Sequence, residues 1–425
     1  MRSGYQYYFS SLDQEAYDFF ISQKAKIDDK DNLFYAIEGI TAPKEVINIH
    51  EYGELAVNKR IQADLENGVS LDVFVFREKD PNALELVVDD MKLLCWLSIE
   101  KDHDRECYSE TELDTVINDN KILLKRYETL RKYFRYNSVT SSSNGQLLIS
   151  LNKLWLTSLR RNINSISIEK ILHELEHTRI LLSQPGSIIG RMISMVRYGL
   201  TLSQLEYIIL NHPQELKPYK KRIKDILKRF NYKDISLDLV FKKEFEILDE
   251  ALCVSNNIND NNEVICYEEA KSIYLNGNFI IKDYYNRYRE IDEFFSDINY
   301  ITDAECAAFK ETYITNFYYD VFKHLPLITT YTPYRYILDG TGVPCEMINA
   351  YHNKSAKHRQ LDLVLDIKLN TVKEDMIEVY IANSKILDPL TNLPFEYDNA
   401  TKKLNFPSGP NPFLRKYSGV TLYDI

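Results

Sequence analysis

The chain has 425 residues, of which 52 are Lys or Arg and 63 are Asp or Glu, so its formal net charge is −11. With 44% hydrophobic and 27% charged residues it can bury a large core, which excludes a globally disordered chain, and its acidic balance argues against a general nucleic-acid binder. Only 13 glycines and 13 prolines are present, about half their usual share. This shortage disfavours turn-rich β-folds and glycine-looped nucleotide-binding sheets, and favours long helices joined by polar loops.

Helical spacing of apolar residues predicts three helices in the first third of the chain, over residues 32–40, 45–67 and 111–134. The first of them is expected to end near Gly39, because Ala42-Pro43 follows as a stop signal. Between the second and third helices, the β-branched run 69–76 predicts a short strand.

The serine-rich stretch 138–145 predicts a loop and the most plausible hinge. After it, residues 146–230 predict one helix after another, with breaks near 162–165, 185–186, 199–201 and 212–213. The basic run 217–229 keeps a helical apolar face, so its lysines and arginines are expected on the solvated side.

The C-terminal segment differs from the helical remainder. Short runs at 395–397 and 404–406 flank the turn residues Asp398-Asn399, which predicts a small β-hairpin. The expected fold is therefore mainly α, a multi-helix array with a small C-terminal β-hairpin. We expect an N-terminal helical region (1–137), a central helical domain (146–385) and a hairpin and tail (386–425) packed on the central domain.

Six cysteines are present, and they form no C-x-x-C pair, which makes a zinc ribbon or a thioredoxin-type site unlikely on spacing alone. Cys95 and Cys107 flank a polar stretch that could fold back and bring them together. A disulfide there is expected only in an oxidising compartment.

One motif points to catalysis. Residues 173–177 read His-Glu-Leu-Glu-His and fit H-E-x-x-H, in which two histidines on one helix face hold Zn²⁺ and the glutamate between them acts as general base. A zinc-dependent, peptidase-like hydrolase would thus use His173 and His177 as metal ligands and Glu174 as the base. The candidate third ligands are acidic residues farther along the chain, namely Glu246, Glu250 and Glu305.

Three observations disfavour this hypothesis. The aliphatic residues of the helix form one stripe, and His173 and His177 fall almost opposite it, among positions expected to be solvated. Glu176 adds a charge between the histidines, and the extended zincin pattern requires other residues where Ile180 and Ser183 stand. We therefore expect no zinc in the purified protein, and a change of less than about 1 kcal/mol in unfolding free energy for His177→Leu.

Three stretches of the sequence resemble those of a known protein family. They are an opening with Asn32-Leu33-Phe34-Tyr35-Ala36, Gly39, Ala42-Pro43 and Tyr52-Gly53, a helix–break–helix over 175–195, and a C-terminal pattern with Asp388-Pro389, Thr391-Asn392, Pro394 and Tyr397-Asp398. Together they resemble an uncharacterised family of mostly helical proteobacterial proteins. The spacing of Cys95 and Cys107 is also similar to a cysteine pair in that family.

The resemblance implies a fold and no activity. The family positions that match His173 and His177 are similar to small or apolar residues, which favours an accidental motif. Members of the family often begin with a short membrane anchor, whereas this chain shows no secretory signal and no apolar run of membrane-spanning length. A cytoplasmic location is expected for the chain as given, and a periplasmic or inner-membrane-associated one if the true start lies upstream. We expect a non-enzymatic interaction or envelope-associated protein with a protein partner and no cofactor.

Overall fold

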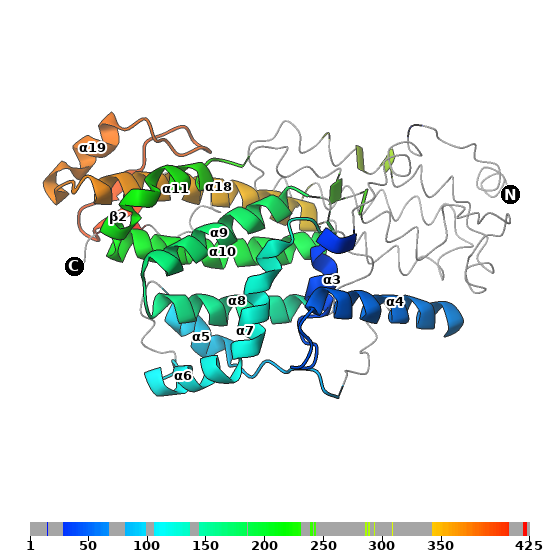
Figure 1. Cartoon of the computed structure of the whole chain (residues 1–425). Helices are drawn as coiled ribbons and strands as arrows, with labels where there is room; N and C mark the ends of the chain where they lie inside the picture. Colours follow the sequence, from blue (N-terminus) through cyan, green and yellow to red (C-terminus); the bar gives the residue numbers. More distant parts are fainter. Residues whose placement is uncertain are drawn as a thin grey trace.

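The computed structural model describes residues 29–67, 81–98, 106–136, 144–184, 186–230, 342–407 and 420–422, with a few isolated residues elsewhere. The described part is mainly helical, as the sequence predicted (Figure 1). Its elements are η1 (Asp29–Asp31), α3 (Leu33–Glu38), α4 (Ile49–Asn67), α5 (Asp90–Leu97), α6 (Glu110–Asp119), α7 (Lys121–Thr129), η2 (Leu130–Lys132), α8 (Gly145–Arg160), α9 (Ser165–Leu182), α10 (Ile188–Asn211), η3 (Pro213–Tyr219), α11 (Lys220–Ile226), α18 (Gly342–Leu369), η5 (Glu374–Met376), α19 (Ile377–Asn383), β1 (Glu396–Asp398), β2 (Lys403–Asn405) and β3 (Val420–Thr421).

Helix α10 is the centre of the described fold. It packs against α8, α9 and α18, and Figure 1 shows these four long helices running side by side with α7 crossing them. Most buried aliphatic and aromatic side chains form a hydrophobic cluster that extends from Leu33 on α3 to Leu422 after β3, and Phe34, Tyr35 and Val57 form a smaller second cluster. The described N-terminal elements and the central helices therefore share a continuous core.

The helix predicted over 32–40 is confirmed as α3. The Asn32 side chain accepts a hydrogen bond from the backbone N–H of Phe34, and Gly39 ends the helix. The predicted strand at 69–76 lies outside the described residues.

Two helix boundaries were predicted wrongly. The stretch 111–134 is not one helix, because α6 and α7 are separated at Asn120, whose side-chain amide donates to the Val87 carbonyl (3.1 Å) and accepts from the Val87 N–H (3.3 Å). The break predicted near 199–201 is absent, and α10 continues through Gly199. In a helix interior glycine is about 1 kcal/mol less favourable than alanine. The packing of α10 against α8, α9 and α18 offsets this cost.

The C-terminal hairpin is confirmed. Strands β1 and β2 pair antiparallel with Glu396 opposite Asn405, and the short strand β3, which the sequence did not predict, pairs with β2. Gln360 on α18 donates a hydrogen bond to the Leu404 carbonyl (2.8 Å), which holds the sheet against the central helices.

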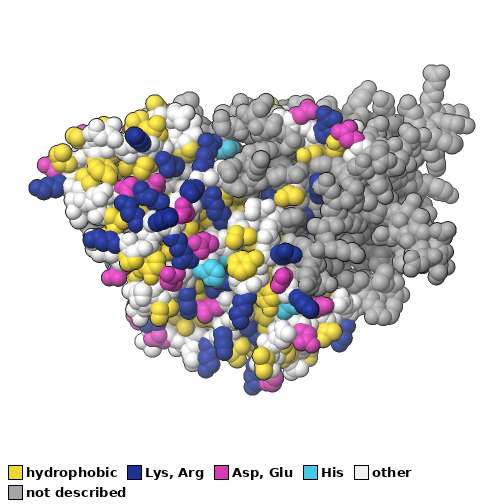
Figure 2. Space-filling model, turned by 45° about the horizontal axis from the view of Figure 1, so that its top comes forward, with side chains coloured by type: hydrophobic (Ala, Val, Ile, Leu, Met, Phe, Trp, Pro, Cys, Tyr) yellow, Lys and Arg dark blue, Asp and Glu magenta, His cyan; other side chains and the backbone are white. Residues whose placement is uncertain are grey.

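The basic run before residue 230 lies on η3 and α11. Its apolar side chains are buried, as predicted, whereas several of its cations are paired with acidic residues of neighbouring helices. Arg222 binds Glu176 on α9, and Lys224 binds Asp366 on α18, each at 2.7 Å. Figure 2 accordingly shows basic and acidic side chains intermixed over the described part of this face.

Among the described residues, no helix has both the length and the apolar character that a membrane crossing requires.

Candidate functional site

The His-Glu-Leu-Glu-His motif lies in the middle of α9, on a helix as predicted. The helix begins at Ser165 because Asn164 and Ser167 form a reciprocal capping box. Its aliphatic stripe, which includes Ile168, Leu172 and Leu175, is buried in the core.

The prediction that both histidines face solvent is right for His173 and wrong for His177. His173 is exposed, whereas His177 and Glu174 are fully buried. The physical reason is that α9 is covered on two sides. Helix α10 packs along α9 and binds Glu174 through Arg197, and η2 with the segment that follows it packs beside Glu174 and His177.

The Glu174 carboxylate accepts three hydrogen bonds at the centre of a buried cluster of charged and polar side chains. Its Oε1 accepts hydrogen bonds from the Tyr127 hydroxyl (2.8 Å) and from Arg197 Nη2 (2.7 Å), and its Oε2 accepts one from Arg131 Nε (2.7 Å). These partners come from α7, η2 and α10, so the cluster joins three elements to α9.

Charge decides the protonation state of Glu174. Burial alone would raise the pKa of its carboxyl, but the guanidinium groups of Arg197 and Arg131 outweigh burial and hold that pKa well below its usual range. The Arg131 guanidinium also lies over the Trp155 ring, 4.0 Å from its centroid. The carboxylate is therefore permanently ionised and engaged on both oxygens.

His177 is a hydrogen-bond donor to the backbone. Its Nε2 lies 2.8 Å from the Tyr133 carbonyl oxygen, so Nε2 carries the hydrogen. Burial lowers the pKa of His177 to about 4, which keeps the imidazole neutral at pH 7. The Phe134 ring lies beside both histidines, with centroid distances of 5.6 Å to His177 and 6.4 Å to His173.

This geometry differs from what zinc hydrolysis requires. A general base must present a carboxylate oxygen to a metal-bound water, but both oxygens of Glu174 are engaged by buried donors. Among the described residues, no group of three or more His, Cys, Asp or Glu side chains could hold a metal ion. The proposed third ligands Glu246, Glu250 and Glu305 lie outside the described residues.

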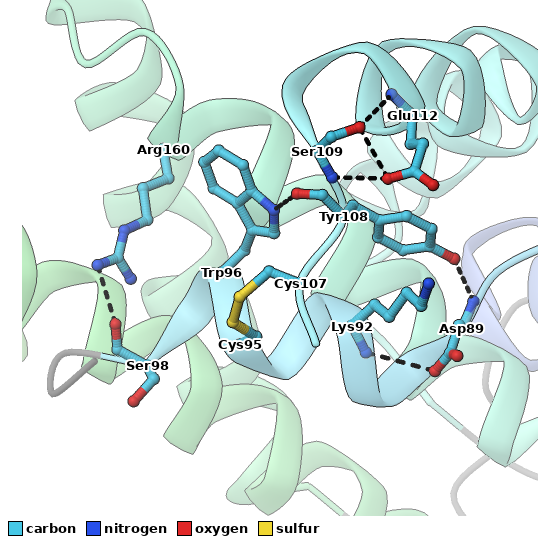
Figure 3. The surroundings of a disulfide bond; sticks show 10 residues. All are labelled: Asp89, Lys92, Cys95, Trp96, Ser98, Cys107, Tyr108, Ser109, Glu112 and Arg160. Carbon is cyan, nitrogen blue, oxygen red and sulfur yellow. Dashed lines mark hydrogen bonds between the residues drawn. A yellow bond between two sulfur atoms is a disulfide. The ribbon is translucent and has the colours of Figure 1, made fainter. Parts of the chain in front are cut away.

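The second predicted pair, Cys95 and Cys107, is brought together and forms a disulfide (Figure 3). The α-carbons are 5.5 Å apart, within the range that a disulfide spans. Cys95 lies on α5 and is half-buried, whereas Cys107 lies in the extended segment before α6 and is exposed.

Hydrogen bonds around the disulfide hold this segment against α5, as Figure 3 shows. The Trp96 indole N–H donates to the Tyr108 carbonyl (2.8 Å), and the backbone N–H of Asp89 donates to the Tyr108 hydroxyl (2.6 Å). The next residue, Ser109, caps α6 through a capping box with Glu112. The segment is thus fixed directly after Cys107.

Sequence reasoning missed Tyr127, Arg131 and Arg197. They are distant from Glu174 along the chain, and Tyr127 and Arg131 occur in a stretch that is rich in aromatic and basic residues. The available signal was Arg197 itself, because it stands within the apolar run of α10, where an unpaired charge would be costly.

The chain matches no protein-family model, and neither a curated protein nor a solved structure matches it significantly.

Proposed function

We propose that this protein is a non-enzymatic helical interaction protein of the cell envelope, which functions with the bond between Cys95 and Cys107 closed. The observation that carries the proposal is the cysteine pair, held at disulfide distance by surrounding hydrogen bonds. Disulfides persist in oxidising compartments such as the bacterial periplasm and are rare in the cytosol. The resemblance to a proteobacterial family whose members often carry a membrane anchor supports the same location.

The non-enzymatic part rests on the motif in α9. Its glutamate forms ion pairs with two buried arginines, and its second histidine donates to a backbone carbonyl, so both groups stabilise the junction of α7, η2, α9 and α10. These roles account for the residues without invoking catalysis.

The location is tested by the thiol state of protein taken from its native cells. Alkylation during lysis, followed by reduction and a second alkylating reagent, distinguishes bonded from reduced cysteines by peptide mass. We expect Cys95 and Cys107 to be protected from the first reagent. If both react with it as readily as a cytosolic thiol protein from the same lysate, the envelope location is wrong.

The metal content of purified protein tests the competing zinc hypothesis. We expect zinc well below one atom per chain. One tightly bound zinc per chain, lost in the His173→Ala variant, would overturn the non-enzymatic proposal.

A further inference from the structure

The two cysteines of the disulfide differ in their exposure to solvent. Cys95 is half-buried on α5 between the core residues Leu93 and Leu97, and Cys107 is exposed. Thiol–disulfide exchange depends on which sulfur the incoming thiolate can reach. Access therefore favours attack at the sulfur of Cys107.

Non-covalent contacts hold Cys107 in place independently of the disulfide. Tyr108 accepts two hydrogen bonds from α5 and the residue before it, and Lys92 on α5 forms an ion pair with Glu106 (2.7 Å). This pair also compensates the carboxylate next to Cys107, so that an incoming thiolate meets no unbalanced negative charge from Glu106. Opening the disulfide would leave the two cysteines close together, and closing it again would be an intramolecular step at high effective concentration.

We propose that Cys107 is a thiol-exchange site and that the bond is reversible in the folded protein. A thiolate attacks Cys107 Sγ, forms a mixed disulfide with it and releases Cys95 as a thiolate. A second thiol of the reductant, or a second molecule of it, then attacks the mixed disulfide, so that two thiols are oxidised to one disulfide while the cysteine pair is reduced. The reverse sequence closes the bond with a disulfide as oxidant. The inference builds on the proposed function, since an oxidising compartment supplies that disulfide.

The experiment compares Cys95→Ser and Cys107→Ser as reduced, full-length proteins. Each is incubated with oxidised glutathione, and glutathionylation of the remaining cysteine of the pair is followed by peptide mass. We expect Cys107 to react at least about tenfold faster than Cys95 in native buffer, because access controls the rate. Concentrated urea should bring the two rates close together. Equal native rates, or a faster Cys95, would overturn the proposal.

Two further measurements use the wild-type chain. Reduction should leave the far-UV circular dichroism and the wavelength of the Trp96 emission maximum unchanged, the latter measured against a Trp96→Phe control. A red shift on reduction would show that the segment detaches, and the bond would then not be reversible in the folded state. The rate at which the Cys95–Cys107 bond is reduced is also compared between glutathione and a C-x-x-C oxidoreductase at equal thiol concentration. The faster reductant identifies the class of thiol that exchanges with Cys107. These assays use purified protein, so their outcome is independent of the thiol state in cells that tests the location.

Discussion

His177 shows how one buried side chain completes the backbone of another segment. The stretch after η2 is extended and cannot satisfy its own polar groups. His177 donates to the Tyr133 carbonyl, Gln184 donates to the Phe134 carbonyl, and the Leu33 N–H donates to the Arg135 carbonyl. The imidazole therefore supplies a hydrogen-bond donor to a backbone carbonyl of another segment.

Substitution at the two histidines should separate their roles. His177→Leu removes the buried donor of the partly buried Tyr133 carbonyl, so we expect the unfolding free energy to fall by about 2 kcal/mol. The control is His173→Leu on the same helix, which should change it by less than about 0.5 kcal/mol because His173 is exposed. Urea unfolding measures both, and equal losses would show that burial of His177 has no energetic consequence.

At the scale of elements, α3 and α4 meet at two glycines. A Cβ atom on Gly39 would lie 1.8 Å from the Ile49 carbonyl oxygen, and one on Gly53 would lie 1.8 Å from the Tyr35 carbonyl oxygen. Both obstacles are backbone atoms, so the helices could accommodate a side chain only by separating. This close contact explains why glycine occupies positions 39 and 53.

We expect Gly53→Ala to destabilise the protein by about 3 kcal/mol, because overpacking forces the two backbones apart. Helix propensity alone predicts the opposite sign, since alanine is favoured over glycine by about 1 kcal/mol. The matched control is Gly190→Ala on α10, where a Cβ meets only side-chain atoms, at 3.2 Å or more, and where we expect a change below about 1 kcal/mol. A stabilised Gly53→Ala variant in chemical denaturation would contradict the close crossing.

At the scale of the whole molecule, three buried histidines make stability depend on pH. Burial lowers the pKa of His177 and His352 to about 4 and that of His358 to about 3. His358 is held neutral between the Tyr198 hydroxyl and the Lys228 carbonyl, while Arg179 and Lys354 oppose a further positive charge there. The junction of α10, α11 and α18 thus contains a base that is kept unprotonated.

The direction of the pH effect follows from proton linkage. Between about pH 6.5 and pH 4 the unfolded chain binds protons at these histidines and the folded chain does not, so stability falls as the pH falls. With one proton at each of the three histidines, the unfolding free energy can fall by at most about 4 kcal/mol per pH unit near pH 5. Urea unfolding at pH 7.5, 6 and 5 measures how the unfolding free energy changes with pH. The His358→Gln variant should take up about one proton fewer on unfolding, which lowers that slope by about 1.4 kcal/mol per pH unit. A stability that is unchanged between pH 7.5 and pH 5 would show that these histidines are not buried in the native state.

Local sequence determined the helical class, the start of α3 at Asn32 and the hairpin near the C-terminus. These features depend on neighbouring residues: caps, periodic apolar positions and turn residues act over a few positions of the chain. The tertiary structure alone decided the role of the motif in α9. Periodicity identified the aliphatic stripe of that helix, but it could not show that arginines of η2 and α10 bind Glu174 beside it. The partners of Glu174 lie between 23 and 47 residues away in the sequence, and such pairing is decided by the packing of whole helices.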